Sequence, residues 1–130
     1  MKYKVLIVDD SIFIRKIIGE AVSKLNCEVV GEAVDVEDAV EKFLKLKPDI
    51  VTMDIHMPSR DGKKSGVDAC KAIKELNPDV KIVMVTALGH RKSVIDAIKA
   101  GANDYIVKPI DEENLIKVFT KLMNPNAAKK

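Results

Sequence analysis

Residues 5–11 read VLIVDDS: four apolar residues are followed at once by two aspartates and a serine. The apolar run is short, rich in β-branched residues and free of polar alternation, which is typical of a strand buried on both faces of a parallel sheet. Similar runs follow at residues 50–53, 82–85 and 105–107. A weaker run at residues 27–33 contains a glycine and two glutamates, which favours a strand at an edge of the sheet.

Amphipathic stretches alternate with these runs. Apolar residues recur at helical spacing within residues 14–25, 39–44, 67–76, 94–98 and 114–123. Asp35 is a candidate N-cap of the second helix, and Gly101 is a candidate C′ residue that ends the fourth. Five strands that alternate with five helices predict a doubly wound α/β fold, with a parallel sheet covered by helices on both faces.

With 130 residues, the chain has the usual length of one domain. We expect residues 1–124 to form this domain and residues 125–130 to form a loose tail. Hydrophobic residues make up 47% of the chain and charged residues 32%, which is typical of a soluble globular protein. The formal net charge of +2 gives no indication of a nucleic-acid or membrane partner.

Two features predict a cytoplasmic location. The N-terminal apolar run stops at Asp9 and is too short for an export signal or a membrane span. Cys27 and Cys70 lie far apart without metal-type spacing, so we expect two buried free thiols in a reducing compartment.

Polar residues stand directly after four of the predicted strands. Asp9 and Asp10 follow the first strand, Asp54 the third, Thr86 the fourth and Lys108 the fifth. In a doubly wound sheet, ligands bind beyond the carboxyl ends of the strands, so we expect these side chains to converge. Crowded carboxylates repel each other, and Mg²⁺ relieves the repulsion. One carboxylate can then accept a phosphoryl group, with Lys108 neutralising charge and Thr86 donating a hydrogen bond.

These strand ends resemble the motifs of receiver domains of two-component response regulators, most closely the single-domain chemotaxis CheY type. The matching segments are VDDS at 8–11, MDIHMP at 53–58, VTA at 85–87 and YIVKP at 105–109. The similarity extends over roughly residues 4–122. It implies a flavodoxin-like, five-stranded sheet of order 2-1-3-4-5, for which CheY-type domains are themselves a known example.

The resemblance implies a role for each residue of the acidic cluster. Asp54 is the expected phosphoacceptor, and Asp9, Asp10 and Asp54 are the expected Mg²⁺ ligands, completed by the backbone carbonyl of His56. The Lys108–Pro109 peptide bond is expected to be cis. The chain would then catalyse its own phosphorylation and slow dephosphorylation rather than act as an enzyme on other substrates.

Thr86 and Tyr105 are the switch pair that the resemblance implies: Thr86 moves toward the phosphate and Tyr105 turns inward behind it. His56, Ala87 and Leu88 occupy positions that modulate the site. Because Leu88 cannot orient water, we expect slow self-dephosphorylation, measurable as the loss of a labelled phosphoryl group over time.

One departure from the family pattern follows Pro58. Gly62 matches the family's glycine by distance from Pro58, whereas Gly66 matches it by register with the helix at 67–76. The difference is an insertion of four residues. We expect a solvated loop extension, with a basic contact for a particular partner as the alternative.

The expected phosphoryl donor is a sensor histidine kinase. In this family the fourth helix, fifth strand and fifth helix form the output face, so we expect a protein target there, with the flagellar motor switch and a phosphatase as candidates. No nucleic-acid recognition segment follows, so we expect no nucleic-acid partner. Ile12 and Phe13 are expected to cover the sheet edge, and a docking patch for the kinase or a phosphatase is the alternative.

Other classes remain open. A phosphatase of the haloacid dehalogenase type needs Asp-x-Asp and a cap domain, whereas Asp9 and Asp10 are adjacent. Flavin binding needs a Ser/Thr/Gly-rich loop after the first strand, where the aspartates would repel phosphate. The acidic cluster disfavours an unphosphorylated interaction module. An isolated receiver domain of a larger regulator in another two-component pathway is a further alternative.

Overall fold

The computed structural model describes residues 2–87 and 89–124. Five strands form one parallel sheet of order β2-β1-β3-β4-β5, which confirms the predicted fold. The strands are β1 (Tyr3–Val8), β2 (Cys27–Ala33), β3 (Ile50–Asp54), β4 (Lys81–Ala87) and β5 (Asp104–Lys108). The helices are α1 (Ile12–Val22), α2 (Val36–Leu46), α3 (Gly66–Leu76), α4 (Arg91–Lys99) and α5 (Glu112–Met123). The weak strand β2 lies at an edge, as predicted, whereas the predicted loose tail at 125–130 lies outside the described residues.

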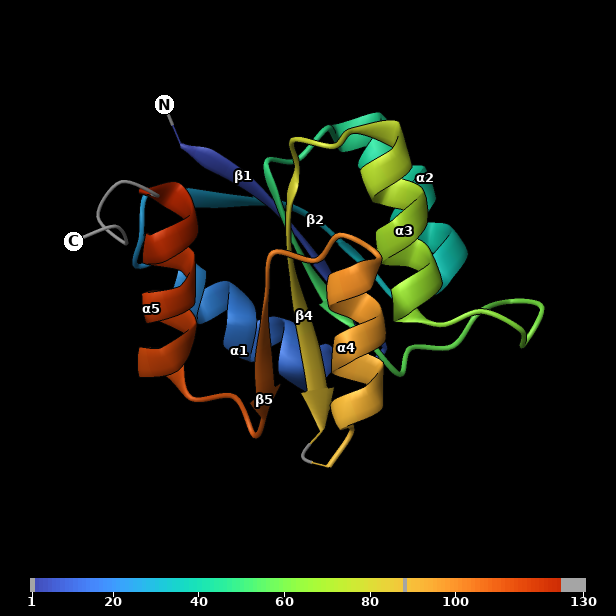
Figure 1. Cartoon of the computed structure of the whole chain (residues 1–130). Coiled ribbons are helices and arrows are strands. Elements are labelled where there is room, and N and C mark those ends of the chain that lie inside the picture. Colours follow the sequence, from blue (N-terminus) through green and yellow to red (C-terminus); the bar gives the residue numbers. More distant parts are fainter. Residues whose placement is uncertain (1, 88, 125–130) are drawn as a thin grey trace.

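Helices cover both faces of the sheet. Figure 1 shows α1 and α5 on one side and α2, α3 and α4 on the other. Alternate residues of each strand therefore enter two separate cores: Leu6 and Val8 pack toward α2 and α3, whereas Val5 and Ile7 pack toward α1 and α5. Burial on both faces explains why the central strands read as continuous apolar runs.

Capping residues set the ends of the helices. Ser11 and Asp35 begin α1 and α2 by accepting hydrogen bonds from backbone amides of the first turn. Ser65 begins α3 in a capping box with Asp68. Gly101 follows α4 with φ of 111°, a left-handed conformation that glycine adopts without steric cost.

The long connection between β3 and α3 projects from the molecule below α2 and α3 (Figure 1). Its residues 60–64 are exposed, but Arg60 anchors it to α2. The Arg60 amide donates to Glu37, and its guanidinium lies 3.4 Å from Asp35 Oδ2 and 3.2 Å from Glu41 Oε1. The loop is solvated as expected, yet it has a fixed contact that the sequence did not suggest.

Ile12 and Phe13 do not cover the sheet edge, so that prediction was wrong. Their exposed fractions are 73% and 69%, because they lie in the first turn of α1 on the side that faces away from the sheet. Cys27 and Cys70 are both buried and free. Within the described residues, no helix is long and apolar enough to span a membrane.

Candidate functional site

The carboxyl ends of β1 and β3 bring the acidic residues together. Val8 pairs with Met53 in the sheet, so the residues that follow, Asp9 and Asp54, leave adjacent strands at the same level. One carboxylate oxygen from each of Asp9, Asp10 and Asp54 lies within 4.8 Å of the others. Asp9 and Asp54 are buried, whereas Asp10 is exposed, so the cluster opens to solvent on one side.

The Asp9 carboxylate is buried, and its environment disfavours the negative charge. Its Oδ1 accepts a hydrogen bond of 2.9 Å from the Ser11 amide, while its buried Oδ2 accepts no hydrogen bond from any residue that the structure describes. Burial is the main cause that raises the pKa of Asp9, and the nearby Asp54 carboxylate raises it further; the Ser11 bond and Lys108 oppose the shift. A buried carboxylate oxygen without a hydrogen bond favours the binding of a cation.

Lys108 is the cation that the fold places in this cluster. Its Nζ atom lies 3.4 Å from Asp9 Oδ2 and 3.5 Å from Asp54 Oδ2, and its side chain is partly exposed. Lys108 ends β5, two strands away from β3, and extends across β4 to reach the carboxylates. The peptide bond between Lys108 and Pro109 is cis. A single positive charge leaves the three carboxylates only partly neutralised.

Backbone hydrogen bonds hold Asp54 and the residues that follow it in place. The His56 amide donates to Asp54 Oδ1 at 3.1 Å, and the Ile55 amide donates to the Val85 carbonyl at 2.9 Å. Gly66 donates its amide to the Ile55 carbonyl at 2.8 Å. These bonds fix the backbone of residues 54–56. Oδ1 of Asp54 is held by the His56 amide, and Oδ2 lies 3.5 Å from the Lys108 ammonium.

The donor set fits a magnesium ion. Mg²⁺ prefers oxygen ligands and binds through one or two carboxylates together with water and phosphate. Asp9 has a buried oxygen without a hydrogen bond, Asp10 is exposed and Asp54 is buried, and together they supply such ligands within one small volume. Within the described residues, no other group of three or more acidic, histidine or cysteine side chains approaches this closely.

Thr86 and Tyr105 lie on neighbouring strands beside the cluster. Thr86 is buried, and its hydroxyl donates a hydrogen bond of 3.3 Å to the Ala87 carbonyl. Tyr105 is 44% exposed. Both side chains, together with Ala87, line a pocket of about 310 Å³ between β4, β5 and the start of α4. Leu88, predicted to modulate the site, lies outside the described residues.

Two contacts were missed by reasoning from the sequence. Arg15, one turn into α1, donates from Nη1 to the Asp9 carbonyl at 2.8 Å. The rings of His56 and His90 lie with their centroids 4.2 Å apart, although the residues are distant in sequence. Neither pair has a motif that could have indicated it, because both contacts depend on how loops and helices pack around the sheet.

An acidic cluster with a lysine at the carboxyl edge of a 2-1-3-4-5 sheet defines a receiver domain. Residues 5–120 match the family model described as the response regulator receiver domain, and the chain belongs to this family. It is 45% identical to the chemotaxis protein CheY of Thermotoga maritima over 94% of this chain and 98% of that protein. It is 43% identical to CheY of Bacillus subtilis over 95% and 100%.

A solved structure gives the same fold. The receiver domain of AraT, a response regulator from Geobacillus stearothermophilus, superimposes with a TM-score of 0.86 at 32% identity over the full length of both chains. The chain is thus similar to CheY proteins in sequence and to a receiver domain of another regulator in structure.

Proposed function

We propose that the chain is a phosphorylation-driven switch in which Asp54 accepts a phosphoryl group in a Mg²⁺-dependent reaction. One observation carries the proposal: three carboxylates share a small volume with a single lysine, and within the described residues a buried oxygen of Asp9 has no hydrogen bond besides its ion pair with that lysine. Such a cluster is costly for a folded protein unless it binds a cation. The similarity to CheY proteins supports the same function.

In the proposed reaction, an Asp54 carboxylate oxygen attacks phosphorus and forms an O–P bond. The P–N bond of a phosphohistidine donor breaks, and its electron pair stays on the imidazole nitrogen, which takes up a proton. Bound Mg²⁺ would neutralise charge on the phosphoryl oxygens, and Asp9, Asp10, Asp54 and the His56 carbonyl would hold it. Lys108 would stay beside Asp54 and stabilise the same developing charge.

The proposed response to phosphorylation is a rearrangement of Thr86 and Tyr105. A phosphoryl group adds roughly two negative charges. The hydrogen bond from the Thr86 hydroxyl to the Ala87 carbonyl is long, at 3.3 Å, so the hydroxyl can exchange it for a bond to a phosphoryl oxygen. If Thr86 moves toward Asp54, the pocket it shares with the half-exposed Tyr105 enlarges, and the tyrosine ring can enter it.

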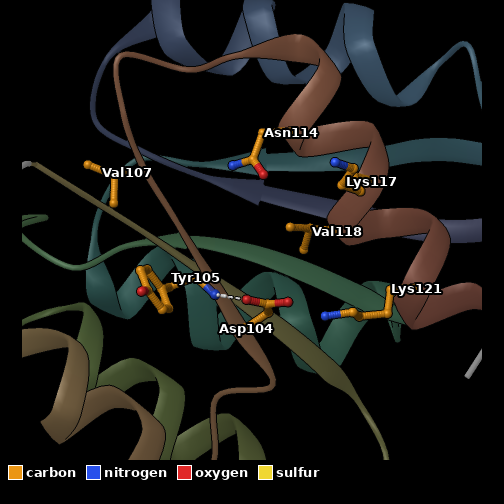
Figure 2. A pocket seen from close by; sticks show the side chains of 7 residues that line it. All are labelled: Asp104, Tyr105, Val107, Asn114, Lys117, Val118 and Lys121. Atoms are coloured by element: carbon orange, nitrogen blue, oxygen red, sulfur yellow. Dashed lines mark hydrogen bonds between the residues drawn. The ribbon is translucent and has the colours of Figure 1, made fainter. Parts of the chain in front are cut away.

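The proposed output surface is the face formed by α4, β5 and α5. Figure 2 shows a pocket on this face, with Asp104, Tyr105 and Val107 from β5 and Asn114, Lys117, Val118 and Lys121 from α5. The pocket has a volume of about 440 Å³. Two valines supply apolar lining, and two lysines outnumber the one carboxylate, that of Asp104, so the pocket suits a protein segment with apolar and acidic residues. The flagellar motor switch is our candidate target, because the relatives are chemotaxis proteins.

The proposed donor is a sensor histidine kinase in the cytoplasm. Ile12 and Phe13 are exposed at the start of α1, next to Asp10, and an exposed apolar pair beside a reactive site is suited to docking. A kinase that contacts this pair would bring its phosphohistidine close to Asp54. A phosphatase that removes the phosphoryl group would use the same approach.

Incubation with Mg²⁺ and acetyl phosphate, followed by intact mass measurement, tests the proposal. The unmodified sequence should gain one phosphoryl group, and Asp54→Asn should gain none. Asp79→Asn, an exposed acidic residue at the opposite edge of the sheet, serves as a matched control and should react normally. Phosphorylation of Asp54→Asn, or equal phosphorylation in EDTA, would overturn the proposal.

A further inference from the structure

Arg15 connects the turn that carries Asp9 and Asp10 to the edge strand of the sheet. Its Nη1 donates to the Asp9 backbone carbonyl at 2.8 Å, and its Nε donates to Glu32 Oε1 on β2 at 2.7 Å. The Arg15 side chain is only 12% exposed, unusually low for a charged residue. A guanidinium held by two partners has a fixed position, because its donors form a rigid planar fork.

The Asp9 carbonyl belongs to the peptide plane that joins Asp9 to Asp10. Because the peptide unit is planar, a bond that fixes the direction of this carbonyl also fixes the direction in which the chain enters Asp10. Two other hydrogen bonds hold the rest of Asp9: its amide donates to the Ala33 carbonyl, and its Oδ1 accepts from the Ser11 amide. The Arg15 bond is therefore the contact that determines how the turn leaves β1.

Asp10 depends on this backbone contact. Its side chain is exposed, and within residues 2–87 and 89–124 its carboxylate makes no hydrogen bond or ion pair. Its position relative to Asp9 and Asp54 is consequently set by the path of the main chain. A tilt of the Asp9–Asp10 peptide would move the Asp10 oxygen away from the point where the three carboxylates meet.

We propose that Arg15 is a positioning residue for the metal site: it orients the Asp9–Asp10 peptide, and Glu32 orients Arg15. Arg15 acts through the backbone and touches neither the ion nor the phosphoryl group. The proposal rests on the proposed function, since the site it serves is the Mg²⁺ site. Groups that orient metal ligands from outside the coordination shell typically change metal affinity by about 10- to 100-fold.

Mg²⁺ binding to the unphosphorylated protein, measured by titration calorimetry, tests the role of Arg15. Arg15→Met should weaken Mg²⁺ binding by about 10-fold. Arg15→Lys keeps the positive charge but lacks the planar guanidinium that donates to two partners at once, so it should retain only part of the Mg²⁺ affinity. Glu32→Ala leaves Arg15 in place without its orienting partner and should weaken binding to a smaller extent.

Lys16→Met is the matched control, because it removes one positive charge from the next, exposed residue of α1. Loss of a positive charge by itself should tighten Mg²⁺ binding slightly in both variants, so a weakening in Arg15→Met cannot come from net charge. Equal Mg²⁺ affinities of Arg15→Met and Lys16→Met would overturn the proposal. Unchanged Mg²⁺ affinity in Arg15→Met, with lower stability against urea in EDTA, would assign Arg15 a structural role only. If Arg15→Met does not fold, Arg15→Lys decides: affinity equal to that of the unmodified protein refutes the proposal.

The outcome also separates this proposal from the proposed function. If the unmodified protein itself takes up no Mg²⁺, the metal-dependent function fails. If it binds Mg²⁺ and Arg15→Met binds equally well, only the role of Arg15 fails.

Discussion

Gly66 lies directly against the backbone carbonyl of Asp54. A Cβ atom at Gly66 would fall 2.0 Å from the Asp54 carbonyl oxygen and 2.9 Å from the Asp54 carbonyl carbon, distances that no side chain can occupy. The first residue of α3 therefore approaches the proposed phosphoacceptor more closely than any other amino acid would allow. This contact identifies Gly66, rather than Gly62, as the glycine that opens the third helix of the family pattern, with the insertion before it.

Gly66→Ala should destabilise the fold and displace Asp54. The clash involves backbone atoms, which cannot rotate away, so we expect a loss of about 1–3 kcal/mol in the free energy of unfolding. Urea denaturation measures it. Gly19→Ala is the control: the added Cβ meets only Ile7 Cδ1 at an ordinary 3.7 Å, and alanine favours a helix. Similar stabilities of the two variants would contradict the close contact.

Lys108→Met should change metal binding and phosphorylation in opposite directions. Loss of an ammonium group 3.4–3.5 Å from Asp9 and Asp54 removes a charge that competes with Mg²⁺, so we expect several-fold tighter Mg²⁺ binding by calorimetry. The rate of phosphorylation by acetyl phosphate should fall by about 100-fold, because a preorganised positive group is lost. Lys99→Met, on the exposed side of α4, should change neither quantity. Weaker Mg²⁺ binding in Lys108→Met would argue against this arrangement.

Asp9→Asn should stabilise the metal-free protein. Burial and the Asp54 charge raise the pKa of Asp9, which means that the charged carboxylate costs more free energy in the folded chain than in the unfolded chain. Removing this charge should increase the free energy of unfolding in EDTA by roughly 1–3 kcal/mol, the range of the desolvation cost of a buried polar atom that lacks a hydrogen bond, as Asp9 Oδ2 does. Addition of Mg²⁺ should raise the melting temperature of the unmodified protein but not of Asp9→Asn. A less stable Asp9→Asn in EDTA would disprove the expectation.

The Cys70 thiol should make stability fall at alkaline pH. Burial raises the pKa of Cys70 from 9.0 to about 11. Below pH 9 both the folded and the unfolded chain keep the thiol proton, so stability is unaffected. Between pH 9 and 11 the unfolded chain loses this proton while the folded chain retains it, so the free energy of unfolding decreases as pH rises, by up to about 3 kcal/mol.

Urea denaturation at pH 8 and at pH 10.5 measures the effect of Cys70. Lysines and tyrosines titrate in the same range, so the relevant quantity is the difference in pH dependence between the unmodified protein and Cys70→Ala. Cys70→Ala should lose less stability on alkalinisation, although the cavity lowers its stability at both pH values. Identical pH dependence in the two proteins would show that the thiol does not contribute.

The residues at the strand ends show how far prediction from the sequence extends. Asp9, Asp54, Thr86 and Lys108 were expected to meet because parallel strands end at a common edge, and topology alone carries such information. The contacts that these residues make with the surrounding helices and loops could not be predicted from the sequence. Ile12 and Phe13 illustrate the difference: apolar residues are usually buried, but the orientation of α1 against the sheet decides which of its faces reaches solvent.

The order of apolar runs and amphipathic stretches determined the layers of the fold, and the polar residues after each run determined which chemistry gathers at one edge. These features are local, because each strand or helix follows from the periodicity of its own residues. The tertiary structure alone decided that Arg15 holds the Asp9 carbonyl, that Gly66 touches Asp54 and that Arg60 binds α2. Such contacts join residues of different secondary-structure elements or loops, even where these are only six apart as in Arg15 and Asp9. Their geometry depends on how whole helices and loops pack, which no single segment encodes.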